Sequence, residues 1–184
     1  MENRLRLRTV IWEIIFPLVL YYIAFLSTMY FIFAFIGRSS ATYMVAQIIA
    51  AAVTIPLMYF ASYKPTQEAF SGKPHISKEL GINIIYIVVI TLLISLALNN
   101  IISMTPLVQM SGGYAQANEN FYGSTLMLEL IGSAILSPIM EELVFRGIVF
   151  GNLRKIMSTC TAIFLSAFLF GIVHFNIVQF IYAF

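Results

Sequence analysis

Four stretches of this chain are long, apolar and almost free of charged side chains. Each exceeds the roughly 20 apolar residues that a helix needs to cross the hydrocarbon core of a bilayer. They are Val10–Ile36, Ala41–Tyr63, Ile82–Met104 and Thr159–Phe184, and only the first holds a Lys, Arg or Glu, at Glu13. A fifth apolar stretch, Tyr122–Leu153, carries Glu129, Glu141, Glu142 and Arg146. The pattern predicts an all-α fold: a polytopic transmembrane helical bundle of about five spanning helices, which forms a single membrane domain over residues 1–184.

The composition excludes several other classes of protein. The chain is 60% hydrophobic and 10% charged, whereas a soluble domain carries about 25% charged residues, so its few charges could not cover a soluble surface. The high apolar content also excludes intrinsic disorder. The net charge of +2 is too small to favour nucleic acid as a partner, and the single cysteine, Cys160, excludes a disulfide framework. We therefore expect the lipid bilayer to surround most of the chain.

Lysine and arginine alternate between the two ends of the expected helices. The N-terminal segment holds three, the next loop holds only Arg38, the 64–81 loop holds three, the 105–121 loop holds none, and the 154–158 turn holds two. Loops that face the cytoplasm carry the excess of positive charge. The alternation predicts a multi-pass protein of the cell membrane with a cytoplasmic N-terminus.

The charges in the fifth stretch are costly, because each charge at membrane depth costs roughly 2.5–3.5 kcal/mol on insertion scales. Glu141, Glu142 and Arg146 lie in the run Met-Glu-Glu-Leu-Val-Phe-Arg-Gly. Glu142 and Arg146 are four residues apart and can pair on one helix face. Glu141 is rotated by about 100° from Glu142, so it points elsewhere and can act as a general base toward a water. The structural alternative is a buried Glu–Arg pair that fixes helix packing, with Glu141 in a wet crevice.

His174 is the histidine of the last apolar stretch, and Phe170 precedes it by one helical turn on the same face. Such a histidine can simply bond to another helix. Its expected depth also favours a shared site with Glu141. About 20 Å of helix separates Glu141 from Arg154, and about 24 Å separates Ser158 from His174. If both helices leave the membrane near residues 154–158, Glu141 and His174 reach similar depths on neighbouring helices.

Several other intramembrane chemistries lack their residues. The chain has no aspartate, which excludes an aspartyl protease, and its histidines, His75 and His174, are too far apart in sequence for the zinc-protease motif. No Gly-x-Ser-x-Gly elbow is present. A tight zinc site needs three or four ligands, and the membrane stretches offer only Glu141, Glu142 and His174. We expect no cofactor, and a metal held by Glu141 and His174 is not favoured.

Two motifs resemble those of the CAAX protease and bacteriocin-processing (CPBP, or Abi) family, whose members include the type II CAAX prenyl endopeptidases. Glu141-Glu142 followed by Arg146 resembles the motif Glu-Glu-x-x-x-Arg, and Phe170-Gly171-Ile172-Val173-His174 resembles the motif Phe-x-x-x-His. Phe145 and Gly147 also fit the first motif. Both motifs lie within residues 133–184, and the family-like core covers about residues 120–184.

The resemblance implies an intramembrane glutamate protease that hydrolyses peptide bonds of membrane-associated proteins or peptides. Glu141 would activate the attacking water, and His174 would assist it or polarise the scissile carbonyl. Glu142 and Arg146 would hold the site together, with Phe170 in support. The implied partners are a peptide or membrane-protein substrate and the lipid bilayer, with a further membrane protein as an open alternative.

The family's third motif, a histidine followed four residues later by Asn or Asp, is absent from this sequence, in which Asn176 follows His174 by only two residues. The apolar end at Phe184 predicts a chain truncated at its C-terminus. The absent motif also leaves an alternative function open: a non-catalytic member of the family that acts in bacteriocin immunity or as a scaffold. A proton or ion pathway through Glu141 and His174 is a third interpretation.

Overall fold

The structure is a computed structural model that describes residues 2–62 and 78–184, and these residues form helices and no strand. The predicted all-α helical bundle is confirmed. The predicted 64–81 loop lies mostly outside the described residues. Within the described ranges, three helices are long and apolar enough to cross a membrane: Leu7–Ile36, Ser40–Ser62 and Gly81–Ser103. Their length and apolar character identify a membrane protein.

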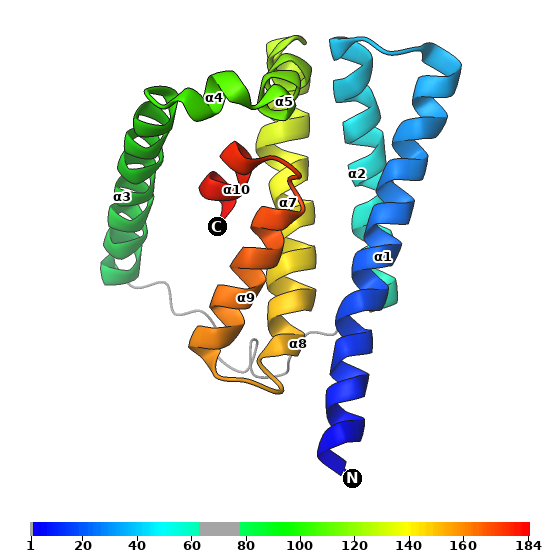
Figure 1. The fold of residues 1–184 in the computed structure, drawn as a ribbon, viewed down its shortest axis with the longest axis vertical. Helices are drawn as coiled ribbons and strands as arrows, with labels where there is room; N and C mark the ends of the chain where they lie inside the picture. The colour runs from blue at the N-terminus through cyan, green and yellow to red at the C-terminus, as the bar shows by residue number, and fades with distance from the viewer. Residues whose placement is uncertain (1, 63–77) are drawn as a thin grey trace.

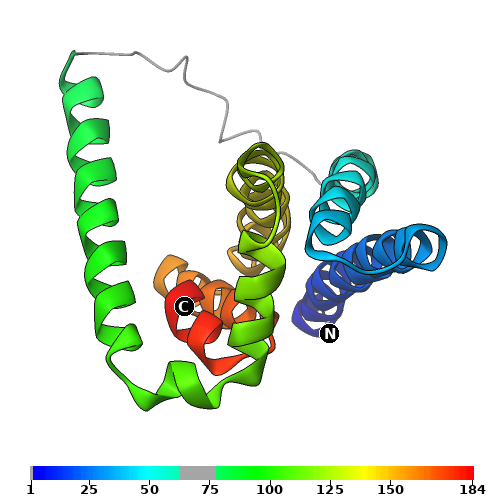
Figure 2. The same ribbon diagram turned by 90° about the horizontal axis from the view of Figure 1, so that it is seen from above.

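The first two helices form an antiparallel pair on one side of the molecule (Figures 1 and 2). Helix α1 (Glu2–Ile36) ends where Gly37 takes a positive φ of 85°, a left-handed conformation that glycine adopts without steric cost. Helix α2 (Ser40–Ser62) then returns along α1. Its buried residues are mostly small or flexible, and this lets the two helices pack closely.

The fifth apolar stretch forms one helical run in the centre of the molecule, in which α-helical and π-helical turns alternate. Its parts are α6 (Leu126–Glu129), η2 (Leu130–Leu136), α7 (Ser137–Glu141), η3 (Glu142–Phe150) and α8 (Gly151–Leu153). Pro138 lies in this run and has no backbone N–H to donate. Wider π-helical turns within α-helices are frequent at functional sites. Here the change of winding falls between Glu141 and Glu142.

Helix α3 (Lys78–Ser103) stands apart from α1 and α2 on the other side of the central run (Figure 2). Two short helices, α4 (Pro106–Met110) and α5 (Gly112–Tyr122), join α3 to the central run across one end of the bundle (Figure 1). The expectation of a loop over 105–121 is therefore wrong. Pro106 starts α4, and the Ser111 side chain caps α5 by accepting a hydrogen bond from the Tyr114 N–H at 3.3 Å.

The expected single span Thr159–Phe184 is also wrong, because it breaks into α9 (Thr159–Ile172) and α10 (Ile177–Ala183). Phe175 has a positive φ of 54°, which turns the chain out of the helix. The Asn176 side chain then caps α10 by accepting a hydrogen bond from the Gln179 N–H at 2.8 Å. Gly171 allows α10 to pack back, since a Cβ there would lie 3.2 Å from the Phe180 carbonyl oxygen.

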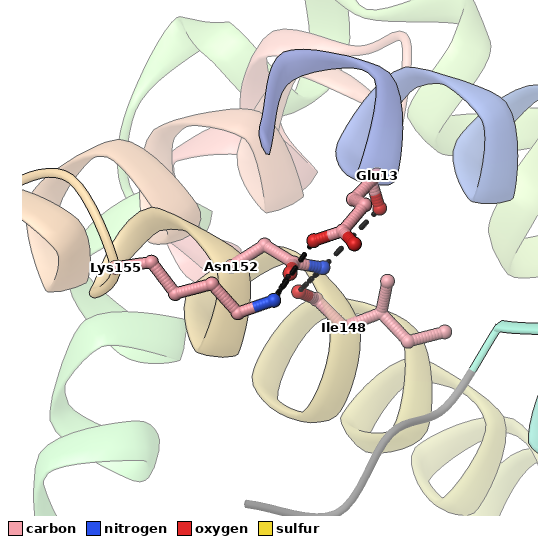
Figure 3. A network of polar contacts seen from close by, with 4 residues as sticks. All are labelled: Glu13, Ile148, Asn152 and Lys155. Atoms are coloured by element: carbon pink, nitrogen blue, oxygen red, sulfur yellow. Dashed lines mark hydrogen bonds and ion pairs between the residues drawn. The ribbon is translucent and has the colours of Figure 1, made fainter. Parts of the chain in front are cut away.

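A polar network ties α1 to the end of the central run, and we call it the end clamp: Glu13, Asn152 and Lys155 (Figure 3). The Asn152 amide donates to the carbonyl oxygens of Glu13 at 3.2 Å and Ile148 at 3.0 Å. Lys155 Nζ donates to Glu13 Oε2 at 2.8 Å and also to Asn152 Oδ1. The charge of Glu13, the single carboxylate in the first predicted span, is thus paired.

Candidate active site

A cavity of about 710 Å³ lies where α1, α2, α5, the central run, α9 and α10 meet. Three of the predicted site residues line it: Glu141, His174 and Phe170. A short turn joins the central run to α9. The side chains of Glu141 and His174 therefore reach the same region, as the similar helix lengths on either side of this turn predict. The cavity wall also contains tyrosines and carboxamides, so it is mixed in polarity.

Glu141 is the last residue of α7 and is half-buried. Its carboxylate makes no hydrogen bond or ion pair with the side chains described, those of residues 7–62 and 81–184. The cation of the same motif, Arg146, interacts with Glu142 instead. Glu141 therefore lines the cavity with a carboxylate that is neither hydrogen-bonded nor ion-paired to a described side chain.

His174 lies just beyond the last turn of α9, and its ring orientation is fixed by a local hydrogen bond. Its Nδ1 lies 2.8 Å from the carbonyl oxygen of Phe170. Because a carbonyl oxygen can only accept, Nδ1 carries the proton, and in the neutral ring Nε2 holds the lone pair. Nε2 makes no hydrogen bond within the described part of the chain. The ring presents an available acceptor nitrogen.

Phe170 connects the two motifs through aromatic contacts. Its ring centroid lies 5.0 Å from that of Phe145 and 4.9 Å from that of His174, edge to face with the imidazole at 85°. The guanidinium carbon of Arg146 lies 5.7 Å from the centre of the Phe170 ring, within the range of a cation–π interaction. Phe170 thus holds the histidine both through its carbonyl and through its ring.

Glu142 and Arg146 do not form the buried pair considered from the sequence. Arg146 Nε lies 3.8 Å from Glu142 Oε1, and the two side chains are 47% and 64% exposed, respectively. Neither residue lines the cavity. The change to π-helical winding after Glu141 turns Glu142 to the outer surface, while Arg146 reaches the site only through Phe170.

Several residues of the cavity wall were not predicted from the sequence. Gln47 of α2 and Ser137 of α7 are both buried and bonded to each other, with Gln47 Nε2 donating to Ser137 Oγ at 2.6 Å. Tyr22 of α1 donates from its hydroxyl to the Val173 carbonyl oxygen at 3.5 Å, next to His174. Gln47 carried a usable signal, because a carboxamide in the middle of an apolar span is costly unless it has a partner.

A second cavity, of about 590 Å³, lies between α3, α5, α9 and α10 and also reaches His174 and Phe170. Tyr182 Oη donates to Asn99 Oδ1 at 2.5 Å and links α10 to α3 along its wall. His174 therefore lies between two cavities. Among residues 7–62 and 81–184, whose side chains the structure describes, no three His, Cys, Asp or Glu side chains are grouped to hold a metal ion. The expectation that no cofactor is bound stays a prediction.

Comparison with known families gives a match for the C-terminal third of the chain. Residues 123–184 match the family model described as Type II CAAX prenyl endopeptidase Rce1-like. Comparisons with curated proteins and with solved structures gave no match. The matched segment contains Glu141, Phe170 and His174 together with the outer pair Glu142 and Arg146. This segment of the chain is therefore similar to the Rce1-like type II CAAX prenyl endopeptidases, the family that its two motifs resemble.

Proposed function

We propose that this chain is an intramembrane endopeptidase that hydrolyses peptide bonds of membrane-associated proteins or peptides. One observation carries the proposal: the unpaired carboxylate of Glu141 and the His174 ring, whose Nε2 is available, line the same cavity. A carboxylate and an imidazole with free acceptor atoms in a partly dry site are the groups needed to bind and activate a water. The match of residues 123–184 to a protease family supports the same reaction class.

The proposed reaction begins with a water that donates hydrogen bonds to Glu141 and to His174 Nε2. Glu141 takes one proton from this water as its oxygen attacks the scissile carbonyl carbon, and a tetrahedral intermediate forms. The carbon–nitrogen bond then breaks, and the proton passes from Glu141 to the leaving nitrogen. His174 acts as a hydrogen-bond acceptor because its Nδ1–H is engaged by Phe170. This favours orienting the water over polarising the scissile carbonyl.

We also propose that the protein is multi-pass with its N-terminus in the cytoplasm. The start of α1, the start of α3 and the turn between α8 and α9 all lie at the lower end of the bundle in Figure 1. These positions border the segments that are rich in lysine and arginine, and positive segments favour the cytoplasmic side. Accessibility of introduced cysteines to a membrane-impermeant reagent, in a chain with Cys160 replaced by serine, tests the orientation.

The proteolysis proposal is tested with the full chain purified into liposomes. The substrates are a pool of apolar membrane-inserted peptides, and the reaction runs in ¹⁸O-labelled water. Peptide-bond hydrolysis places one ¹⁸O in the new C-terminal carboxylate, which mass spectrometry detects. Glu141→Gln keeps the size of the side chain and removes the base, so cleavage should fall by about 10²–10⁴-fold.

Glu129→Gln is the matched control, because Glu129 lies in the same helical run, accepts a hydrogen bond from the Ser124 N–H at 3.2 Å and does not line the cavity. A glutamine keeps that acceptor, so cleavage should stay at the starting level. Cleavage that survives Glu141→Gln would contradict the protease proposal. Unchanged binding of a membrane partner by Glu141→Gln, with no cleavage by either form, would favour the scaffold alternative.

A further inference from the structure

Tyr21 is the most deeply buried residue that α1 contributes to the wall of the cavity around Glu141. Only 8% of its surface is exposed, and it belongs to a buried apolar cluster that contains Met140, the residue before Glu141. Its ring centroid lies 5.0 Å from that of Tyr22, edge to face, and 6.1 Å from that of Phe25, with which it stacks. These contacts hold the ring in place beside the central run.

The hydroxyl group of Tyr21 has no hydrogen-bond partner among the described residues. It also keeps accessible surface, in contrast to Gln47 Oε1 and Thr54 Oγ1, which are buried without a partner. Because Tyr21 is otherwise packed into the protein and lines the cavity, this accessible oxygen opens into the cavity. A free hydroxyl on a fixed ring can therefore meet a group that enters the cavity.

Tyr21 differs from two other tyrosines of the cavity wall in its position relative to Glu141. Its hydroxyl lies close enough to the Glu141 carboxylate for the two groups to interact electrostatically. Tyr22 and Tyr43 also line the cavity, but no such interaction with Glu141 acts on either. Tyr22 also uses its hydroxyl on the Val173 carbonyl oxygen at 3.5 Å. The free donor of Tyr21 is thus near the proposed base.

The proposed reaction needs a hydrogen-bond donor that Glu141 and His174 do not supply. As the water oxygen attacks, the π electrons of the scissile carbonyl move onto its oxygen, which becomes an anion that donors must stabilise. Glu141 holds the proton destined for the leaving nitrogen, and His174 presents an acceptor nitrogen to the water. A phenol keeps its proton at neutral pH and can donate one hydrogen bond. The Tyr21 hydroxyl has the chemistry that is missing.

We propose that Tyr21 Oη donates a hydrogen bond to the scissile carbonyl oxygen and stabilises the negative charge that forms there when water attacks. The inference rests on the proposed proteolytic function. Tyr21 keeps its proton throughout. When the carbon–nitrogen bond breaks, the electron pair on the oxygen re-forms the carbonyl, and the leaving nitrogen takes the proton from Glu141. Tyr21 is then a catalytic residue supplied by α1, outside the segment 123–184 that matches the protease family.

The test compares two probes that differ at one bond. The first is a dye-labelled membrane peptide of leucine, alanine and phenylalanine, and in the second a phosphinate group, which is tetrahedral and anionic, replaces one central peptide bond. Energy transfer to a second dye on Cys160, which is exposed, reports the binding of each probe in liposomes. The phosphinate imitates the intermediate when Glu141 takes up a proton, so the unchanged chain should bind it at least about 10²-fold more tightly than the peptide.

Tyr21→Phe removes only the hydroxyl and keeps the ring contacts. It should weaken binding of the phosphinate by about 10–100-fold and leave binding of the peptide nearly unchanged, because an uncleaved carbonyl carries much less charge. Tyr43→Phe, the matched control, removes another hydroxyl from the same wall and should keep the preference for the phosphinate. On a peptide that the chain cleaves, Tyr21→Phe should lower kcat by about 10²-fold with little change in KM.

Two results with Tyr21→Phe would overturn the inference: an undiminished preference for the phosphinate, or an equal loss of both probes, which a packing role predicts. An unchanged chain that binds both probes without preferring the phosphinate would contradict the proposed protease function, and the inference with it. The two failures are distinguishable, because the first is measured on the variant and the second on the unchanged chain.

Discussion

The end clamp and the cavity around Glu141 are two polar regions built from similar side chains. They differ in whether their polar atoms have hydrogen-bond or ion-pair partners. In the end clamp, the Glu13 carboxylate is bonded to Lys155 at 2.8 Å, and Asn152 uses its amide on two carbonyl oxygens. At the cavity, the Glu141 carboxylate has no partner among the described side chains, and Gln47 Oε1 is buried without a hydrogen bond from them. Each region joins helices that are distant in sequence.

The difference indicates what each carboxylate is for. In apolar surroundings, a nearby cation stabilises the charge of a carboxylate. A carboxylate without a cation is a candidate for binding a ligand or accepting a proton. Lys155 pairs with Glu13 and Arg146 lies 3.8 Å from Glu142, whereas no lysine or arginine whose side chain the structure describes forms an ion pair with Glu141. The end clamp joins α1 to the central run through paired charges, and the cavity wall carries a carboxylate without such a partner, as the proposed protease function requires.

The largest effect is expected at His174, which tests whether the cavity residues act in chemistry. His174→Asn places an amide N–H near the position of Nδ1 and removes the acceptor at Nε2, so kcat should fall by about 10²-fold with little change in KM. His174→Gln places an amide oxygen near the position of Nε2 and should restore part of the rate. Steady-state kinetics on a cleaved peptide make the measurement, and equal rates for all three forms would contradict the role of Nε2.

The second-largest effect is expected from Gly171→Ala. This change tests whether the cavity depends on the packing of α10 against α9. A Cβ at this position would lie 2.7 Å from Phe180 Cδ2 and 3.2 Å from the Phe180 carbonyl oxygen. Overpacking of this kind costs about 1–3 kcal/mol, so Tm in detergent should fall and cleavage should fall with it. Gly151→Ala, where the Cβ meets open space, is the control. An unchanged Tm in Gly171→Ala would show that α10 does not pack as described.

A smaller effect is expected in the end clamp, which should alter stability without altering chemistry. Lys155→Met removes the ion pair to Glu13, whose side chains are 38% and 27% exposed for lysine and glutamate, respectively. Exposed pairs contribute about 0.2–1 kcal/mol, so unfolding free energy should fall by that amount while kcat stays constant. A double-mutant cycle with Glu13→Gln isolates the pair. A large loss of kcat without a loss of stability would remove the distinction between the two regions.

The smallest effect is expected from Glu142→Gln. This carboxylate is 64% exposed and 3.8 Å from Arg146, so its removal should change unfolding free energy by no more than about 0.5 kcal/mol. Arg146→Met should cost more, because it also removes the contact with the Phe170 ring. Thermal unfolding of the two variants makes the comparison. A Glu142→Gln loss larger than that of Arg146→Met would show that the outer pair, and not the ring contact, supports the site.

The sequence was a reliable guide to the helices and to the approximate meeting point of the two motifs. Long apolar runs require helices because a lipid-exposed backbone must satisfy its own hydrogen bonds. The fixed rise per residue then gave Glu141 and His174 similar depths across the short turn at residues 154–158. Neither inference depends on the details of packing, which is why both could be made from residue order.

The interruption between α9 and α10 and the contacts between distant helices depended on tertiary packing. An apolar run does not reveal that Phe175 turns the chain or that α10 packs back over Gly171, since both require neighbours from other helices. The widened turns after Glu141 expose Glu142, whereas regular helical spacing allowed a buried pair. Gln47 and Ser137 are 90 positions apart in sequence, and no local pattern joins them.

The sequence by itself determined that this is a helical membrane protein and that Glu141 and His174 reach a common region of it, because hydrophobicity and helical rise are local properties. Only the tertiary structure decided which polar atoms are paired and which remain free, because pairing depends on where helices from distant parts of the chain come into contact. Glu13 is paired with Lys155, whereas Gln47 is bonded to Ser137 through Nε2 and has no described partner at Oε1.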